Sequence, residues 1–428
     1  MSLQAGIFDV SAQEKFGEML KLSALIDVAL EKNPEVLAAK DKWESANELI
    51  EARRALPDPE ISYSYFLENV ETRVGPQRHV IGVRQKLPFY GKRDLKAEIA
   101  LKEAETLKAS YEATKQELIR QVKKSFYDLF YVSKLIDITH SEKEILKTFE
   151  EIAMTKYQTG TGTQQNILKV QVEISRLEER LLMLSNQKQT AEAMLSTLLN
   201  RPVDYPMGKP EEPRFRKFYY IQEELFRMGR KNRPELRGGL ARIEKSNTAL
   251  SLAKKDYFPD LTVGANYIEI GEGAMPVNDN GKDAFNVMFS INLPIWKKKL
   301  SSQVNSVSKM IKAEKNRYET ILNRTLFEIK DNYFKIQTAR ETYYLYTNVL
   351  IPQAGQSLRS AEAGYITGKV SFLDVLDAER ILLQIQFGLW RAYTDYLQRI
   401  ADMERAVGLE LHEYRPEDDI PARVLEEQ

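Results

Sequence analysis

Two aspartates lie three residues apart in the segment "GYITGKVSFLDVLDAE", which begins at Gly364. On a helix this spacing places both side chains on one face, so the carboxylates of Asp374 and Asp377 would point in the same direction. Carboxylates gathered in this way can attract and select cations. The alternative is a solvated pair in which Asp377 caps the helix or binds Arg380. The residues alone favour this second interpretation.

Side chains that could support catalysis or hold a cofactor are sparse. The chain has no cysteine, and its three histidines, His79, His140 and His412, have no partner at metal-ligand spacing. No glycine-rich phosphate loop follows a strand. The many acidic residues alternate with lysines on helical surfaces, where a solvated face is the usual outcome. We predict that the protein is not an enzyme, has no dedicated metal site and needs no cofactor.

Composition limits the possible partners. The chain has 62 basic and 62 acidic residues, so no net field attracts nucleic acid, which is not an expected partner. A transmembrane helix is not expected, because no run of about eighteen apolar residues occurs and the mean hydropathy is −0.44. The strands of a β-barrel alternate and escape this test. We expect no signal peptide at Met1–Leu3, and an upstream signal or lipidated cysteine stays an open alternative.

An internal repeat covers nearly the whole chain. The segment "LPFYGK" begins at Leu87, and "LPIWKK" begins at Leu293, about 206 positions later. Three further pairs of segments match in the same order: "KNPEVLAAK" from Lys32 with "NRPELRGGL" from Asn232, "RRALPDPEISYSY" from Arg53 with "KKDYFPDLTVGANY" from Lys254, and "KYQTGTGTQQNILKVQ" from Lys156 with "GYITGKVSFLDVLDAE". Two copies of one unit therefore make up the protein.

Within each unit the hydrophobic period changes in a fixed order. The pattern is helical from about Leu22 to Leu56, with Pro34 early in it. It then alternates with period two over about 60–69 and 78–88, on either side of a polar loop containing Gly75 and Pro76. The second unit alternates in the same way over about 260–270 and 284–294. Each pair predicts a β-hairpin with one apolar and one polar face.

A very long helix is predicted after each hairpin. No glycine or proline lies between Gly91 and Gly160, or between Pro294 and Pro352. At about 1.5 Å per residue, roughly 65 helical residues span on the order of 100 Å. Apolar or small residues recur along one face of the first helix and form a packing stripe. Each unit therefore reads as helix, hairpin, very long helix and returning helix.

The two repeated signatures lie where a hairpin ends and a long helix begins. Pro88 and Pro294 end strand pairing and suit a helix's first turn. Aromatic residues follow, with cations such as Lys92 just beyond, which is typical of a membrane–water interface. A soluble corner with solvated lysines explains a single motif equally well, but the recurrence favours the membrane. The predicted interface residues are Phe89, Tyr90, Trp296 and Lys297.

A membrane-inserted sheet of this chain raises the question of closure. Each chain supplies four strands, whereas a barrel without an open edge needs about eight or more. Several copies would therefore have to contribute strands to one barrel.

The order of elements, given twice, resembles the TolC family of outer-membrane efflux channels. The segments that carry the resemblance are "GVRQKLPFYGKR", "NPEV" with "RPEL", "FPDL" and "GYITGKVSFLDVLDAE". It covers essentially all of the chain after about Lys21. The metal- and drug-efflux outer-membrane factors of tripartite pumps are the most similar members.

The resemblance implies a mixed α+β, mostly helical homotrimer in the outer membrane of a Gram-negative bacterium. Its twelve strands would form one barrel in contact with outer-membrane lipid, and a long α-helical barrel would place most of the mass in the periplasm. Such channels are passive ducts that work with a periplasmic adaptor (membrane fusion) protein and an inner-membrane efflux pump.

The implied organisation divides the chain into four parts. The first repeat would cover 21–208, with helices over about 91–158 and 163–200. A Pro-rich equatorial linker would cover 209–219, and the second repeat 220–408, with helices over about 295–351 and 370–407. A C-terminal equatorial tail would cover 409–428.

The resemblance also implies a gate at the tips of the helical hairpins. Asp374 and Asp377 match the family's aspartate rings at the periplasmic entrance, and Tyr365 matches a tyrosine that helps to close it. This sequence departs from the family's closing network: Val370 replaces an arginine and Asn166 an aspartate. Lys369 is one position away and could substitute for the arginine.

Four glycines mark the two hairpin turns: Gly160, Gly162, Gly364 and Gly368. Ordinary helix termination explains them. The second interpretation is that small residues let an adaptor's helical hairpin dock closely at these tips.

The alternative from another functional class is a soluble coiled-coil scaffold or interaction protein. It explains the long helices and the balanced charge. It does not explain why an alternating strand such as Phe285–Ile291 would point its apolar side chains away from any core partner.

Overall fold

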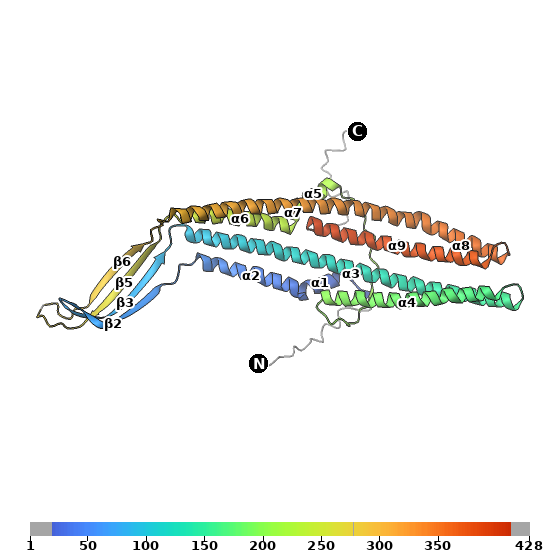
Figure 1. Cartoon of the computed structure of the whole chain (residues 1–428). Coiled ribbons are helices and arrows are strands. Elements are labelled where there is room, and N and C mark those ends of the chain that lie inside the picture. The colour runs from blue at the N-terminus through green and yellow to red at the C-terminus, as the bar shows by residue number, and fades with distance from the viewer. Residues whose placement is uncertain (1–18, 277, 412–428) are drawn as a thin grey trace, which may run out of the picture. The chain divides into compact units, whose positions relative to one another are not determined.

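The computed structural model describes residues 19–276 and 278–411. The expected tail therefore lies outside the described residues beyond position 411, as do His412 and Met1–Leu3. The elements follow in the order β1 (Met19–Leu20), α1 (Leu22–Lys32), α2 (Pro34–Arg54), β2 (Glu60–Thr72), β3 (Gly75–Leu87), α3 (Lys92–Gln158), α4 (Gln164–Leu198), β4 (Lys209–Pro210), α5 (Gln222–Asn232), α6 (Pro234–Lys255), β5 (Leu261–Ile270), β6 (Ala284–Ile291), α7 (Lys297–Leu345), η2 (Tyr346–Leu350), α8 (Ile351–Ile366) and α9 (Phe372–Val407) (Figure 1). The order helix, hairpin, long helix and returning helix occurs twice.

The chain divides into two compact units, each assembled from both repeats. One unit takes residues 39–111 and 235–321, which include both β-hairpins. The other takes the remaining segments, which include α1, α4, α5, α8 and α9. Because α3 and α7 are so long, each contributes residues to both units.

The two β-hairpins join into one antiparallel sheet of four strands, in the order β2-β3-β5-β6. Residues that are paired across neighbouring strands have their side chains on the same face of the sheet. The register therefore shows which residues make up each face. One row runs Ile61, Val83, Ala265, Val287, and the next runs Tyr63, Ile81, Tyr267, Phe285. The opposite face carries the row Ser62, Gly82, Asn266, Asn286. The sheet therefore has one apolar and one polar face, as its alternation predicts.

Among the described residues, none covers the apolar face of the sheet. Ile61 is 79% exposed, Phe285 is 69% exposed and Phe289 is 71% exposed. An uncovered apolar face of this size marks a surface that meets a membrane or a partner. Both outer strands, β2 and β6, also keep one edge without a partner strand in the described chain.

The helix expected from about Leu22 to Leu56 is two helices, and this prediction was wrong in detail. α1 ends at Lys32 and α2 begins at Pro34, which lacks the N–H that a continuous helix would need. The side chain of Asn33 caps α2 by accepting hydrogen bonds from the backbone N–H groups of Glu35 (3.0 Å) and Val36 (3.4 Å). Proline at the first position of α2 is therefore a starting signal, and Pro234 starts α6 in the same way.

The first β-hairpin is longer than its sequence pattern suggests. β2 continues to Thr72 and β3 already begins at Gly75, so the segment read as a polar loop is mostly strand. The hydroxyl of Thr72 donates to the carbonyl of Gly75 (2.6 Å), which tightens the turn. A break in the register between Tyr65 and Val70 disturbs the alternation, and this is why the pattern ends early.

Pro352 does not end the second long helix, contrary to the boundary at about 351. α7 passes through a single π-helical turn, η2, and continues as α8 to Ile366. Within this turn the N–H of Ile351 bonds to the carbonyl of Tyr346, five residues back. The wider turn absorbs an extra residue directly before the proline, which then lies at the start of α8, where its missing donor costs little.

The apolar stripes of the helical hairpins meet in a buried cluster. It consists of Leu146 on α3, Val170 and Leu177 on α4, and Phe372, Leu376 and Leu383 on α9. The two helical hairpins, α3/α4 and α8/α9, are thus held together by side chains near their turns.

Candidate functional site

The turns at the ends of the two helical hairpins are built alike. Gly160 and Gly368 both have φ of 74°, a left-handed conformation that favours glycine. In both turns two backbone N–H groups return to one carbonyl of the preceding helix, that of Lys156 in the first turn and that of Gly364 in the second. A Cβ on Gly160 or Gly368 would meet no atom within 4 Å, so these positions are open.

A lysine that sequence analysis did not single out joins the two turns. The ammonium of Lys156, on α3, lies 3.7 Å from the ring centre of Tyr365, on α8, and also donates to the Tyr365 backbone carbonyl (3.4 Å). A cation over an aromatic face is an electrostatic attraction. Tyr365 itself packs on Phe372 (5.2 Å between ring centres), and this burial raises the pKa of its hydroxyl. The spacing of two helices cannot be read from one sequence, so no local signal revealed this pair.

Asp374 has a structural task in addition to any role at an entrance. Its Oδ2 accepts hydrogen bonds from the backbone N–H and the hydroxyl of Ser371, both at 2.8 Å. The Asp374 N–H in turn donates to the Ser371 hydroxyl (3.4 Å), so the two residues form a capping box that starts α9. The side chain remains on the surface.

Asp377 lies on the surface with its carboxylate 65% exposed. It forms an ion pair with Arg380 (3.2 Å), as one of the two sequence interpretations allows. Arg380 also binds Glu173 on α4 (2.7 Å), which ties α9 to the neighbouring helical hairpin. An exposed contact of this kind contributes little to stability.

The remaining predicted gate residues are not brought together. No hydrogen bond among the described residues joins Asn166, in the first turn of α4, to Tyr365. The exposed ammonium of Lys369 has no ion pair within the part of the chain that the structure describes. The cation that lies over the Tyr365 ring is Lys156. The gate assignments themselves stay predictions.

The segment between the sheet and the long helices is organised by one buried ion pair. Lys92, which was expected among exposed interface cations, is 5% exposed, so this expectation was wrong. Its ammonium binds Asp260 (2.9 Å) and the carbonyl of Phe258 (3.0 Å). Asp260 also accepts the backbone N–H of Phe89 (3.0 Å) and pairs with Lys86 (3.2 Å). The lysine of "LPFYGK" thus anchors the end of β3 to the start of β5.

The predicted interface aromatics divide into two groups. Phe89 is partly buried and stacks on Phe258, with 4.7 Å between ring centres. Tyr90 is 88% exposed and Trp296 is 72% exposed, and Lys297 beside Trp296 is also on the surface. Exposed rings at the ends of strands with an apolar face fit a membrane interface, whereas Phe89 serves the junction.

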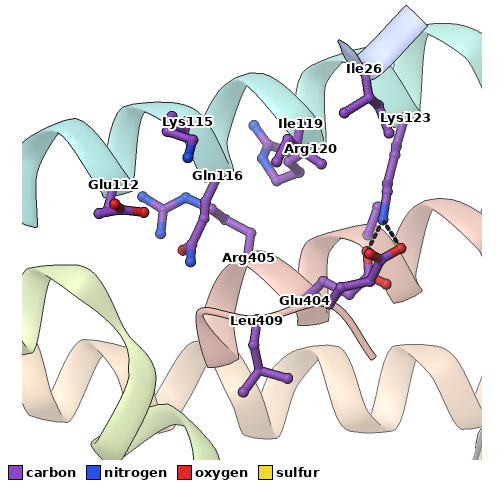
Figure 2. A pocket seen from close by; sticks show the side chains of 12 residues that line it. Ile26, Glu112, Lys115, Gln116, Ile119, Arg120, Lys123, Glu404, Arg405 and Leu409 are labelled. Atoms are coloured by element: carbon purple, nitrogen blue, oxygen red, sulfur yellow. Dashed lines mark hydrogen bonds and ion pairs between the residues drawn. The ribbon is translucent and has the colours of Figure 1, made fainter. Parts of the chain in front are cut away.

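Figure 2 shows a pocket of about 280 Å³ between α1, the middle of α3 and the end of α9. Several of the charged side chains at this pocket form ion pairs. Lys123 and Glu404 meet at 2.6 Å with 7% and 8% of their side chains exposed, and Arg120 binds Asp402 at 3.0 Å. Burial raises the pKa of Glu404, although Lys123 opposes this shift. Burial acts in the same direction on Glu117, but the hydrogen bonds and charge of Arg120 lower its pKa overall. The pocket is a matched network that joins α3 to α9.

Neither metal chemistry nor a helical membrane span is indicated by the described residues. Within 19–276 and 278–411, no three His, Cys, Asp or Glu side chains are grouped so that they could hold a metal ion. No helix in these ranges is long and apolar enough to cross a membrane.

Solved structures share the two-repeat fold. They include the outer membrane protein VceC of Vibrio cholerae (TM-score 0.73, 20% identity, 90% of this chain and 96% of that one) and the open state of the MtrE outer membrane channel of Neisseria gonorrhoeae (TM-score 0.73, 20% identity, 92% and 90%). In sequence, the chain is 22% identical over 400 residues to the cobalt-zinc-cadmium resistance protein CzcC of Cupriavidus metallidurans, covering 91% of this chain and 90% of that one.

The family model described as outer membrane efflux protein matches residues 25–201 and 225–409. The chain belongs to this family. The predicted resemblance is confirmed, and so is the prediction that the protein is an efflux channel component and not an enzyme. The coiled-coil scaffold is not favoured.

Proposed function

We propose that this chain forms the outer-membrane exit duct of a tripartite efflux system, as a homotrimer with one twelve-stranded barrel. The observation that carries the proposal is the four-stranded sheet, with its bare apolar face and two unpaired outer strands, in a chain of the outer membrane efflux protein family. A sheet of this kind is satisfied when its apolar face meets lipid and its edges meet further copies. Three copies supply twelve strands, enough to close a barrel.

The internal repeat indicates how neighbouring copies join. Asp260 precedes β5 and binds Lys92, which follows β3. Their counterparts in the other repeat are Asp58, which precedes β2, and Lys298, which follows β6. Both counterparts are exposed, and within the described chain neither has an ion pair. If β6 of one copy lies beside β2 of the next, Lys298 meets the neighbour's Asp58 and the buried junction is repeated between chains.

The same reasoning gives the register between copies. Within the chain Leu87 pairs with Leu261, and Gln85 with Val263. Transferring this register through the repeat pairs Ile291 with Ile61, Ser290 with Ser62 and Phe289 with Tyr63 of the next copy. Each of these pairs joins residues of the same face, apolar with apolar and polar with polar. A shift by one residue would place an apolar side chain opposite a polar one in every pair. The match of faces therefore supports this register.

In this barrel the predicted interface residues lie at the boundary of the lipid. Tyr90, Trp296 and Lys297 lie at one end of the strands and form a ring of aromatic and basic groups at the lipid boundary. The helical part then extends from this boundary into the periplasm of a Gram-negative cell.

The helical tips form the periplasmic entrance in this proposal. Threefold symmetry turns Asp374 and Asp377 into two rings of three carboxylates, which favour cations. The contact of Lys156 with Tyr365 takes the closing role in each copy, and Lys369 and Asn166 are further residues of the same gate. The turns at Gly160, Gly162, Gly364 and Gly368 dock the periplasmic adaptor, which links the duct to an inner-membrane pump. A relative named for cobalt, zinc and cadmium resistance agrees with a cationic cargo.

Single-channel conductance in a planar bilayer tests the proposal. Detergent-extracted protein should give small, long-lived steps that prefer cations, and the double variant Asp374→Asn/Asp377→Asn should lose this preference. Asparagine retains an oxygen that can cap α9, so the turn should survive the change. A matched control is Asp331→Asn on α7, a carboxylate paired with Lys335 far from both turns. A protein that stays soluble without detergent and never inserts would restore the scaffold interpretation.

A further inference from the structure

Two glutamates meet inside the packing of the helical hairpins. Glu142 lies on α3 and is 7% exposed, and Glu379 lies on α9 and is 3% exposed. Each lies one turn from residues of a single buried cluster that joins α3 to α9, so the two carboxyl groups are close enough to interact, and two buried carboxyl groups this close favour a state in which one carries a proton. They lie beside the apolar cluster of Leu146, Leu376 and Leu383, which is one turn away from them on the same helices.

The cations next to this pair are engaged elsewhere. Lys143, adjacent to Glu142 in the chain, points to Glu178 on α4 (2.8 Å). Arg380, adjacent to Glu379, is held by Glu173 on α4 (2.7 Å) and by Asp377. The charge that reaches the pair from α8 is another acid, Glu362. These neighbouring charged groups are therefore either acids or cations that already form ion pairs with other acids.

The pair is also incompletely hydrogen-bonded. Oε2 of Glu379 is buried without a partner in the described chain. The contrast with Glu404 is direct, because that equally buried glutamate binds Lys123 at 2.6 Å. A buried carboxylate without a cation is strongly destabilising unless it is neutral.

We propose that Glu142 and Glu379 form a proton-binding joint between the two helical hairpins of each chain, closed while the pair is protonated and loosened when both carboxylates ionise. Protons are thus a ligand of this site, and their concentration regulates how tightly α3 packs on α9. This regulation deepens the proposed function, since the joint lies in the same hairpins as the proposed entrance.

The direction of the pH effect follows from linkage. Burial, together with the hydrogen bond and charge of Glu379, raises the pKa of Glu142 to about 9, and burial also raises the pKa of Glu379. The folded state therefore holds protons that the unfolded state releases above about pH 4.5. Stability falls as the pH rises from that value towards about 9, and is highest below it.

The test measures the distance between the two helical hairpins by pulsed electron spin resonance. The chain has no cysteine, so Gln158→Cys on α3 and Ser360→Cys on α8 place one label on each hairpin at exposed sites. Labelled chains are diluted in unlabelled ones so that only distances within a chain are seen. We expect a longer-distance population that grows as the pH rises through about 9. Glu379→Gln, which cannot ionise but keeps the shape, should abolish this population and flatten the pH dependence of Tm.

Glu144→Gln is the matched control, because this glutamate lies on α3 near Glu142, is 69% exposed and is paired with Lys147 on the same helix. It should behave as wild type throughout. An unchanged distance from pH 5 to pH 10 in the wild type, or a Glu379→Gln variant with the wild-type pH profile, would overturn the proposal. The measurement needs no conduction. If channel activity failed but the pH response of the distance were present, the proposed function would be disproved, whereas the proposal of a proton-binding joint would stand.

Discussion

At the scale of single residues, the sequence identified positions more reliably than contacts. Tyr365, Asp374 and Asp377 are all near the helical turns, as expected. The side chain that reaches Tyr365 is Lys156, however, from a turn about 209 residues earlier. Lys92 was placed among solvated cations but is buried against Asp260. Both errors have one cause, since a partner from the other repeat is invisible in a local pattern.

Replacing Lys156 by glutamine should weaken the link between the two turns. A cation–π contact contributes about 0.5–2 kcal/mol, so the equilibrium between closed and open entrances should shift towards open by about 2- to 30-fold. Single-channel recording would show this as longer or more frequent openings. Lys147→Gln, on the same helix and paired with Glu144 on the surface, is the control and should not change the openings. Equal opening in both variants would contradict the role given to Lys156.

At the scale of elements, the repeat and the periods predicted the order and type of the long segments. What they did not predict are the interruptions. Three of these are the break at Asn33, the π turn at Tyr346–Leu350 and the short parallel pairing of β1 with β4. Each depends on a few local or cross-strand hydrogen bonds, which at Asn33 are accepted by the side chain. Pro34 and Pro352 look alike in the sequence. Pro34 marks the boundary between two helices, whereas the helix continues through Pro352. Periodicity averages over such positions and cannot separate the two outcomes.

The π turn explains the presence of Gly388 on α9. A Cβ at this position would lie 2.4 Å from the ring of Tyr346, so only glycine lets the turn pack on α9. Gly388→Ala should therefore lower the free energy of unfolding by about 1–3 kcal/mol through overpacking. Thermal denaturation measures the effect.

Gly355, on α8, is the matched control for Gly388. A Cβ there would meet only the guanidinium of Arg359, at 3.4 Å. Gly355→Ala should be neutral or stabilise by up to about 1 kcal/mol, because alanine favours a helix interior. If both substitutions raised Tm, the close packing of the π turn would not be the reason for Gly388.

At the scale of the whole molecule, the two repeats differ in how the strands join the helices. Lys92 and Asp260 form an ion pair at one strand–helix junction, whereas their counterparts Asp58 and Lys298 are exposed and have no ion pair among the described residues. The sequence predicted the need for several copies from the strand count alone. The sequence did not give the register of the strands. The pairing of β6 with β2 of the next copy could be proposed only from the register observed within the sheet.

Cysteine cross-linking tests that join. The double variant Ser62→Cys/Ser290→Cys places two thiols opposite each other between copies, within reach of a disulfide. Oxidation should yield a covalent species of three 49.4 kDa chains on a denaturing gel. The pair Ser64→Cys/Ser290→Cys keeps the same face but is displaced by about 7 Å along the strand, and should cross-link poorly. Preference for the displaced pair would disprove the register.

The unpaired outer strands also have a consequence for biogenesis. A single copy in water exposes apolar side chains on one face and backbone hydrogen-bonding groups along both edges, a combination that invites misassembly. In the proposed trimer, other copies and lipid would cover these groups together. Formation of the folded sheet should then depend on chain concentration more steeply than in direct proportion, and newly made chains would need protection until three of them meet at the membrane.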